Sequence, residues 1–329
     1  MIEQIAKQVG VVVIGRNEGE RLVVCLRSLI LDTKTVVYVD SGSTDNSVDA
    51  AKQLGVAVVN LDLTLPFTAA RARNAGFLHL LTMNCDLKYV QFVDGDCEVV
   101  SGWMPAAYDF LQVNPLVAVV CGRRRERYPE ASIYNHMCDI EWNTPIGEAK
   151  ACGGDAMMRV DCLKQVGGYR ESLIAGEEPE LCIRIRHAGF KIWRIDHDMT
   201  LHDAAITKFS QWWRRTVRTG HAYAEGASLH GMPPERHWVR ESRRAWIWGG
   251  ILPLTFMILL GFKPQLALLI VLLHLLQWVK LIYSNKRFSN FSPVYSAFLM
   301  IGKLAEMLGQ LKYYWLRLLN KHSRIIEYK

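Results

Sequence analysis

The sequence places two carboxylates around a glycine directly after an apolar run. Residues 92–96 read Phe-Val-Asp-Gly-Asp, so Asp94 and Asp96 flank Gly95 where a buried strand would end. Hard divalent cations prefer oxygen ligands, and a cation held there would neutralise charge on a departing diphosphate. An acidic turn also follows many strands that bind no metal, so this motif needs other polar residues beside it.

Two more polar clusters follow apolar runs. They cover residues 15–18 and 40–45. In a sheet of parallel strands, ligand sites lie beyond the carboxyl ends of the strands. These two clusters and the Asp94–Asp96 turn are therefore expected to meet at one sheet edge. The clusters at 15–18 and 40–45 contain Arg16, Asn17, Glu18, Asp40 and Ser41.

The elements that position these clusters alternate along the first two hundred residues. Short apolar runs predict strands, and segments with helical spacing predict helices between them. The expected strands are 11–14, 36–39, 56–61, 89–93 and 117–121, and the expected helices are 20–30, 47–54 and 69–81. This pattern predicts an α/β fold of Rossmann type, with a mostly parallel sheet and helices on both faces.

The charge is unevenly distributed. The chain has a net charge of +7, yet residues 1–207 carry 21 Lys and Arg against 27 Asp and Glu. The positive charge therefore collects in the last third, around the most apolar stretch, which points to a membrane surface and not to nucleic acid. With 50% hydrophobic and 22% charged residues, the composition excludes a disordered chain.

Residues 246–262 and 265–282 form two apolar segments separated by Lys263 and Pro264. A helix needs about 20 apolar residues to cross a bilayer, so each segment is near the lower limit. Basic residues flank the pair, which places both ends on the cytoplasmic side. The alternative is a helical hairpin buried in a soluble domain.

Two further segments, 209–224 and 296–319, combine aromatic and basic residues at helical spacing. Such helices favour the headgroup region of a membrane, and the alternative is that they pack on the main domain. We expect a catalytic domain over 1–235 that includes the first segment, and a membrane region over 236–329 that ends in the second.

The eight cysteines form no CxxC pair, and the N-terminal residues show no secretory signal. Both features indicate a reducing compartment. The expected location is the inner (cytoplasmic) membrane, with the catalytic domain facing the cytoplasm.

Several short motifs occur in a characteristic order. They are Gly-Arg-Asn-Glu at 15–18, Asp-Ser-Gly-Ser-Thr-Asp at 40–45, Arg-Ala-Arg-Asn at 71–74, Asp-Gly-Asp at 94–96, Gly-Gly-Asp at 153–155 and Gly-Glu-Glu-Pro-Glu-Leu at 176–181. Over about residues 10–205 the chain resembles the family 2 glycosyltransferases of GT-A fold. The apolar pair resembles membrane-attached members that act on lipid-linked or membrane-bound acceptors.

The resemblance implies a nucleotide-sugar site and a divalent cation, Mn²⁺ or Mg²⁺. It implies that Asp94 contacts the ribose and that Asp96 and His202 hold the metal. The remaining donor-binding residues that it implies are Arg16, Asn17, Glu18, Asp40, Ser41, Arg71, Arg73, Asn74, Gly95, Gly153, Gly154 and Asp155. Because residues two apart on a helix do not share a face, only one of Arg71 and Arg73 is expected to reach the phosphates.

The resemblance also implies a general base in the acidic run after Gly176. Glu178 occupies the position where the family usually has Asp, and Glu177 or Glu180 are the alternatives. The expected reaction is an inverting, metal-dependent transfer of a sugar from a nucleotide diphosphate to a lipid-linked or glycan acceptor. The alternatives are a non-catalytic nucleotide-binding membrane scaffold and a sugar-nucleotide pyrophosphorylase.

Overall fold

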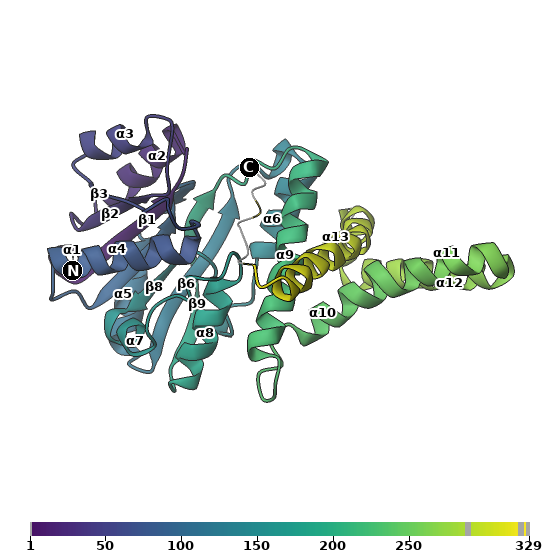
Figure 1. Ribbon diagram of the computed structural model, residues 1–329. Helices are drawn as coiled ribbons and strands as arrows, with labels where there is room; N and C mark the ends of the chain where they lie inside the picture. Colours follow the sequence, from purple (N-terminus) through teal and green to yellow (C-terminus); the bar gives the residue numbers. More distant parts are fainter. Residues whose placement is uncertain (1, 287–290, 322–325, 327–329) are drawn as a thin grey trace. The chain divides into compact units, whose positions relative to one another are not determined.

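The computed structural model describes residues 2–286, 291–321 and 326. The chain divides into two compact units, Met1–Thr207 and Lys208–Lys329. Figure 1 shows the α/β first unit and the all-helical second unit.

Within the described residues, nine strands of the first unit form one sheet in the order β3-β2-β1-β4-β8-β6-β9-β5, with β7 paired to β9. The strands are β1 (Val9–Gly15), β2 (Val36–Asp40), β3 (Ala57–Asn60), β4 (Tyr89–Asp94), β5 (Cys97–Val99), β6 (Val117–Glu126), β7 (Gly147–Ala149), β8 (Ala156–Arg159) and β9 (Lys191–His202). The five strands expected from apolar runs are all present.

The sheet has a parallel half and a mixed half. Strands β3, β2, β1 and β4 are parallel, as predicted. Beyond them β8 runs antiparallel to both β4 and β6, while β6 and β9 are parallel to each other. The fold is therefore α/β with a mixed sheet.

Helices cover the sheet of the first unit (Figure 1). They are α1 (Ile2–Gln8), α2 (Glu20–Leu29), α3 (Ser47–Gln53), α4 (Ala69–Met83), α5 (Trp103–Val113), the 3₁₀ turn η1 (Pro129–Ala131), α6 (Ile133–Trp142), α7 (Val160–Gln165) and α8 (Glu177–His187). Helix α4 approaches β1 and β2 closely, because a Cβ on Gly76 would lie 2.4 Å from a methyl group of Val12 and 2.8 Å from one of Val39.

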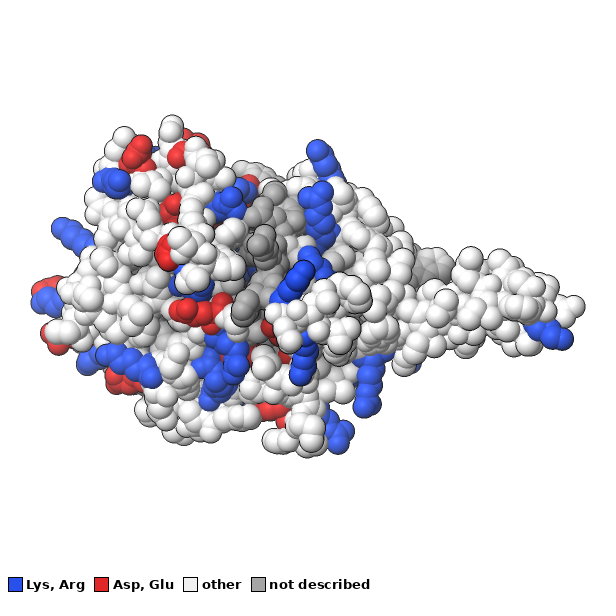
Figure 2. All heavy atoms as spheres, viewed as in Figure 1, with Lys and Arg blue, Asp and Glu red and all other residues white. Residues whose placement is uncertain are grey.

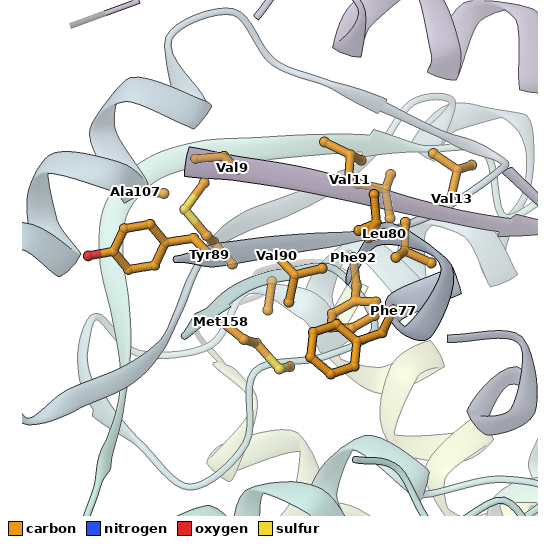
Figure 3. Packing of buried hydrophobic residues seen from close by; sticks show 14 of the residues in the cluster. Val9, Val11, Val13, Phe77, Leu80, Tyr89, Val90, Phe92, Ala107 and Met158 are labelled. Atoms are coloured by element: carbon orange, nitrogen blue, oxygen red, sulfur yellow. The ribbon is translucent and has the colours of Figure 1, made fainter. Parts of the chain in front are cut away.

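The core of the first unit lies between the central strands and these helices. Val11 and Val13 of β1 and Phe92 of β4 are fully buried. Figure 3 shows them beside Phe77 and Leu80 of α4. Strands covered on both faces read as continuous apolar runs, which is why these strands were predictable from sequence.

The second unit consists of helices over its described residues 208–286, 291–321 and 326. They are α9 (Phe209–His230), α10 (Val239–Trp246), the π-helical turn η2 (Ile247–Ile251), α11 (Leu252–Phe262), α12 (Pro264–Ser284) and α13 (Ser292–Leu318). Ser242 of α10 donates a hydrogen bond to Gln310 of α13 at 2.6 Å, and both side chains are buried.

Glycines bring α9 and α13 into backbone contact. A Cβ on Gly220 of α9 would lie 2.0 Å from the carbonyl oxygen of Glu306, and one on Gly309 of α13 would lie 2.0 Å from that of Val217. Small residues at such crossings allow helix axes to approach closely. Helix α9 therefore packs within the second unit, which begins at Lys208, whereas the sequence analysis grouped this helix, up to residue 235, with an α/β core of about 10–205.

Two helices are long and apolar enough to cross a membrane. They are Val239–Phe262 and Pro264–Ser284, and only 11% and 6% of their most apolar windows are buried. On the face shown in Figure 2, the paired helices α11 and α12 are almost free of charged side chains. Over the part of the chain that the structure describes, this exposure contradicts the alternative that the two helices form a hairpin buried in the core of a soluble domain.

Candidate active site

Asp40 closes the turn after β2. Its Oδ2 accepts hydrogen bonds from the backbone N–H groups of Gly42 and Ser43, both at 2.9 Å. Its Oδ1 accepts one from the Tyr38 hydroxyl at 2.9 Å, and the side chain is buried. The carboxylate is therefore fixed at the carboxyl end of the strand.

Asn17 joins the turn after β1 to the turn after β2. It has a positive φ of 56°, its backbone N–H donates to the hydroxyl of Ser43 at 2.9 Å, and its Oδ1 accepts from the backbone of Thr44 at 2.7 Å. Two polar clusters predicted to meet are thus held together by direct hydrogen bonds.

The neighbours of Asn17 have other contacts. The Arg16 guanidinium lies over the ring of Phe67, 4.9 Å from its centroid. Glu18 forms an ion pair with Arg21 at 2.8 Å. Ser41 is buried, and its backbone N–H donates to the carbonyl of the last residue of β1.

The two arginines of α4 point to different places, as the helical spacing predicted. Arg73 is 3% exposed and forms ion pairs with Asp94 at 2.8 Å and with Glu177 at 2.7 Å. Arg71 donates to the backbone carbonyls of Leu65 and Pro66. Arg73 thus links the end of β4 to the start of α8, while Arg71 bonds to the segment that precedes its own helix.

Asn74 contacts another part of the chain. Its side-chain amide donates to the carbonyl of Tyr169 at 2.9 Å and accepts from the Tyr169 N–H at 2.8 Å. It also donates to Glu171 at 3.0 Å. These contacts hold α4 against the turn after α7, and its proposed contact with the donor stays a prediction.

Arg124 lies beside Asp94, a position that the sequence did not predict. Its guanidinium forms ion pairs with Asp94 at 2.8 Å and with Asp155 at 3.1 Å. The Oδ1 of Asp155 in turn accepts a hydrogen bond from the Asp94 N–H at 3.0 Å. Burial alone would raise the pKa of Asp94, but Arg73 and Arg124 outweigh it and hold the pKa of this carboxyl below its ordinary value.

The sequence signal for Arg124 was the run of three arginines at the end of β6. Arg123 pairs with Asp139 at 2.9 Å and Arg125 with Asp198 at 2.9 Å, so the middle arginine alone of the three turns toward Asp94. Alternate residues of a regular strand point to opposite faces, but the register with β9 shifts on either side of Arg123, so alternation alone does not identify Arg124.

Asp96 and His202 meet across the strand pair β5–β9. The Nε2 atom of His202 lies 3.3 Å from Asp96 Oδ2, and its Nδ1 lies 3.8 Å from Glu126 Oε2. Cys97 is the register partner of His202, and the donor atoms of Asp96, Cys97 and His202 all lie within 4.8 Å of one another. All of these side chains are buried.

This donor set fits a divalent cation. Carboxylate oxygen and imidazole nitrogen together suit a borderline ion such as Mn²⁺, and a ligating histidine commonly has a carboxylate beside its other ring nitrogen, as Glu126 is here. Burial raises the pKa of the Cys97 thiol well above its ordinary value, and Mn²⁺ and Mg²⁺ prefer carboxylate and imidazole ligands over a thiol. Asp96 and His202 have the ligand types for such an ion, and their role as its ligands stays a prediction.

Gly154 lies directly against the acidic cluster. A Cβ at this position would be 2.9 Å from Asp94 Oδ2 and 3.0 Å from a terminal nitrogen of Arg73. Only glycine allows the backbone to come this close to the ion pair. Gly153 has a positive φ of 85° and open space around its Cα.

Glu178 is buried at the start of α8. Its Oε1 accepts a hydrogen bond from the backbone N–H of Cys152 at 2.6 Å and from the thiols of Cys152 at 3.1 Å and Cys182 at 3.0 Å. Burial raises the pKa of Glu178, although these hydrogen bonds act in the opposite direction. A raised pKa suits a carboxylate that must accept a proton near neutral pH.

The two neighbouring glutamates are paired with arginines. Glu177 bonds to Arg73 at 2.7 Å, and Glu180 bonds to Arg184 at 2.7 Å. Among the three candidates for the base, Glu178 is therefore the one whose hydrogen bonds described above come from thiols and a backbone amide instead of a cation.

Residues 10–167 match the family model described as glycosyl transferase family 2. Over this range, just under half of the chain, the protein is similar to the family 2 glycosyltransferases. The match spans β1 through α7, and so includes the Asp94–Asp96 turn and the Gly153–Asp155 segment.

Two curated proteins share parts of this sequence. The glycosyltransferase AglE of Haloferax volcanii is 24% identical over 197 residues, which are 56% of this chain and 63% of that protein. The succinoglycan biosynthesis protein ExoA of Rhizobium meliloti is 41% identical over 51 residues, 16% of each chain. The chain thus spans less than two thirds of the length of either relative.

Solved glycosyltransferase structures share its fold. The mannosyltransferase PcManGT from Pyrobaculum calidifontis, solved with GDP-Man and Mn²⁺, aligns with a TM-score of 0.61 at 17% identity and covers 94% of this chain and 87% of its own. Glucosyl-3-phosphoglycerate synthase from Mycobacterium tuberculosis, solved with Mg²⁺ and UDP, aligns with a TM-score of 0.52 at 17% identity over 71% of this chain and 84% of its own. The first unit therefore has the GT-A fold.

Proposed function

We propose that the protein transfers a sugar from a nucleotide-diphosphate sugar, with a divalent cation, to an acceptor held at a membrane. One observation carries this proposal: Arg73 bonds to Asp94 at the end of β4 and to Glu177 at the start of α8 at the same time. The residues expected to bind the donor are therefore connected to the start of the helix that carries Glu178, the residue expected to act as base.

The donor is proposed to lie along the carboxyl ends of β1, β2 and β4. The turns fixed by Asn17 and Asp40 would receive the nucleoside, and Asp94 the ribose. Asp96 and His202 would hold Mn²⁺ or Mg²⁺, which stabilises the negative charge of the diphosphate as it leaves. The solved relatives with GDP-Man and Mn²⁺, or with UDP and Mg²⁺, support this assignment.

Glu178 is proposed as the general base. The oxygen of an acceptor hydroxyl attacks the anomeric carbon, the bond from that carbon to the diphosphate oxygen breaks, and the hydroxyl proton passes to the Glu178 carboxylate. A single displacement of this kind inverts the anomeric configuration. The backbone N–H of Cys152 holds Oε1, and we assign the proton to Oε2.

The acceptor is proposed to be lipid-linked or a membrane-bound glycan at the inner face of the cytoplasmic membrane. The two exposed apolar helices support membrane attachment, by their length and composition. Arg240, Arg243 and Arg244 come just before the apolar part of the first helix, which is the arrangement expected at a cytoplasmic membrane surface.

Thermal unfolding with nucleotides tests the donor site. Full-length protein in detergent is heated with UDP, GDP or dTDP, with and without Mn²⁺. A ligand at 100 times its dissociation constant adds about 2.7 kcal/mol, which raises the melting temperature measurably. We expect one nucleotide to act, only with Mn²⁺, and Asp96→Ala to abolish the effect. Stabilisation by no nucleotide, or an equal effect in Asp96→Ala, would contradict the proposal.

A further inference from the structure

Two thiols and a carboxylate converge at Glu178. The Sγ atoms of Cys152 and Cys182 lie 3.7 Å apart. Each also lies close to Glu178 Oε1, at 3.1 and 3.0 Å. The glycosyl-transfer mechanism proposed above needs the carboxylate but gives the two thiols no role.

The local structure fixes this arrangement. Glu178 and Cys182 are four residues apart on α8, so they lie on the same face of the helix. Cys152 reaches the same point from the segment between β7 and β8, where its N–H bonds to Glu178 at 2.6 Å. Cys152 is half-buried, so the cluster is accessible from one side, whereas Cys182 is fully buried.

The sulfur–sulfur distance matches that of a tetrahedral metal site, and the two sulfur–oxygen distances are those of hydrogen bonds. With zinc–sulfur bonds of about 2.3 Å, two thiolates on one ion lie about 3.8 Å apart, close to the 3.7 Å between these sulfur atoms. A glutamate oxygen is a common third ligand of zinc, and the fourth position of an open site is taken by water.

The electrostatics favour a cation over a reactive thiol. Burial raises the pKa of Cys182 to about 11, and the nearby Glu178 carboxylate acts in the same direction. Burial also raises the pKa of Cys152. Protonated, buried thiols are slow in disulfide exchange. A divalent cation offsets the negative charge that opposes ionisation of both groups.

We propose that Cys152, Cys182 and Glu178 form a second metal site, which shares no residue with the Asp96–His202 pair and takes a thiophilic divalent cation such as Zn²⁺. On binding, the two thiols release their protons to the buffer and the sulfur atoms coordinate the ion. The carboxylate coordinated there can no longer accept a proton, so Zn²⁺ at this site inhibits sugar transfer. This last step rests on the proposed role of Glu178, whereas metal binding itself does not.

Cobalt spectroscopy tests binding without any assay of activity. Full-length protein in detergent, reduced and freed of metal, is titrated with Co²⁺. Thiolate coordination gives a charge-transfer band in the near ultraviolet, which Zn²⁺ should bleach by displacement. We expect Cys152→Ser and Cys182→Ser each to lower the affinity for Co²⁺. The loss should exceed the roughly tenfold to hundredfold that follows removal of a residue that only hydrogen-bonds to a metal ligand.

Two control variants separate this site from other thiols. Cys85 is exposed, so Cys85→Ser should leave the band unchanged. Cys97 lies beside Asp96 and His202, so a band lost in Cys97→Ser but kept in both test variants would overturn the proposal. Equal Co²⁺ affinity in wild type and Cys152→Ser would do the same. If a serine variant does not fold, the wild type is alkylated with and without Zn²⁺, and mass spectrometry measures the alkylation of Cys152. We expect Zn²⁺ to protect Cys152. Equal alkylation with and without Zn²⁺ would overturn the proposal.

Activity gives an independent readout of the effect on the base. With Mn²⁺ in excess, we expect micromolar Zn²⁺ to inhibit the wild type and Cys85→Ser alike. Zn²⁺ that binds at the cobalt site without inhibiting would overturn the inhibitory step and leave binding intact. Absence of transfer with any donor, together with an intact cobalt band, would instead count against the proposed glycosyltransferase activity.

Discussion

At the scale of single residues, Asp94 is held by two guanidinium groups at once. Arg73 takes its Oδ1 and Arg124 its Oδ2, both at 2.8 Å. A carboxylate bonded at both oxygens has a fixed orientation and stays ionised. The site is therefore organised around an arginine from β6 as well as the residues of the Asp-Gly-Asp turn.

Arg124→Gln should destabilise the fold strongly. The substitution leaves the fully buried side chain of Asp155 without its cation, and breaking a buried pair typically costs about 3 to 5 kcal/mol. Thermal and urea unfolding measure this loss. The matched control is Arg125→Gln, whose pair with Asp198 is half-exposed and is worth less than about 1 kcal/mol. Equal losses in the two variants would contradict the prediction.

Glu178→Gln should abolish sugar transfer and stabilise the fold at neutral pH. Removing a general base lowers the rate by about a hundredfold to ten-thousandfold. Burial raises the pKa of Glu178, so the folded protein prefers the protonated form. The ionised carboxylate therefore costs stability above its folded pKa, and this cost disappears as the pH falls below its ordinary value. The amide has no such cost.

The measurement for this variant is the melting temperature between pH 4 and pH 8, together with initial rates. The difference between Glu178→Gln and wild type should be largest at the alkaline end and shrink toward pH 4. A variant that is less stable than wild type at pH 8 would show that the carboxylate is stabilised by its hydrogen bonds to a greater extent than burial destabilises it.

At the scale of elements, strands formed by apolar runs were predictable, including the partly exposed β3, and the polar or very short strands were not. Strands β1, β2 and β4 are largely apolar, whereas β9 mixes buried and partly exposed residues and includes several charged ones. Strands β5 and β7 have three residues each, too few for a periodic pattern. The antiparallel insertion of β8 depends on tertiary pairing, which local sequence does not encode.

The residues of the candidate site were also predictable only in part. Its motif residues at strand ends, such as Asp94 and Asp96, were predicted by position and by the family resemblance. Arg124 was not, because the register between β6 and β9 shifts on either side of Arg123 and hides the simple alternation of a strand. The thiols around Glu178 come from segments 26 and 4 residues away, and the meeting of Cys152 with α8 depends on the fold.

Gly309→Leu should separate α13 from α9. A Cβ at Gly309 would lie 2.0 Å from the Val217 carbonyl oxygen, so any side chain forces the helix backbones apart. Overpacking of this kind typically costs about 1 to 3 kcal/mol or more. Thermal unfolding in detergent measures it. The control is Gly261→Leu on α11, where a Cβ meets open space. A melting temperature unchanged in both variants would contradict the close packing.

At the scale of the whole molecule, the chain joins an acidic α/β unit to a basic helical unit with two exposed apolar helices. The sequence grouped α9 with the α/β domain because this helix carries both aromatic and basic residues, a pattern that fits either unit. Helix α9 belongs to the second unit because glycines allow it to pack against α13. The spacing of glycines on one helix does not indicate which helix it packs against.

Two charges on the exposed face of α12 should release the protein from membranes. Leu268 and Leu272 are 67% and 51% exposed. Replacing both with Asp adds about 5 to 7 kcal/mol to the cost of membrane insertion. We expect Leu268→Asp/Leu272→Asp to move from the membrane pellet to the supernatant. Leu31→Asp, at an 82% exposed leucine of the first unit, should remain in the pellet.

The order of the strands has a consequence for synthesis. Strand β9 is the last strand of the sheet to be made, yet it lies between β6 and β5 and also pairs with β7. A nascent chain that ends before Lys191 therefore leaves three strands without this neighbour, and the histidine beside Asp96 arrives only with the last residue of β9. Contacts of such long sequence separation form slowly. The first unit thus becomes complete only shortly before the apolar helices themselves are synthesised, which places folding of the sheet and delivery to the membrane in the same interval of translation.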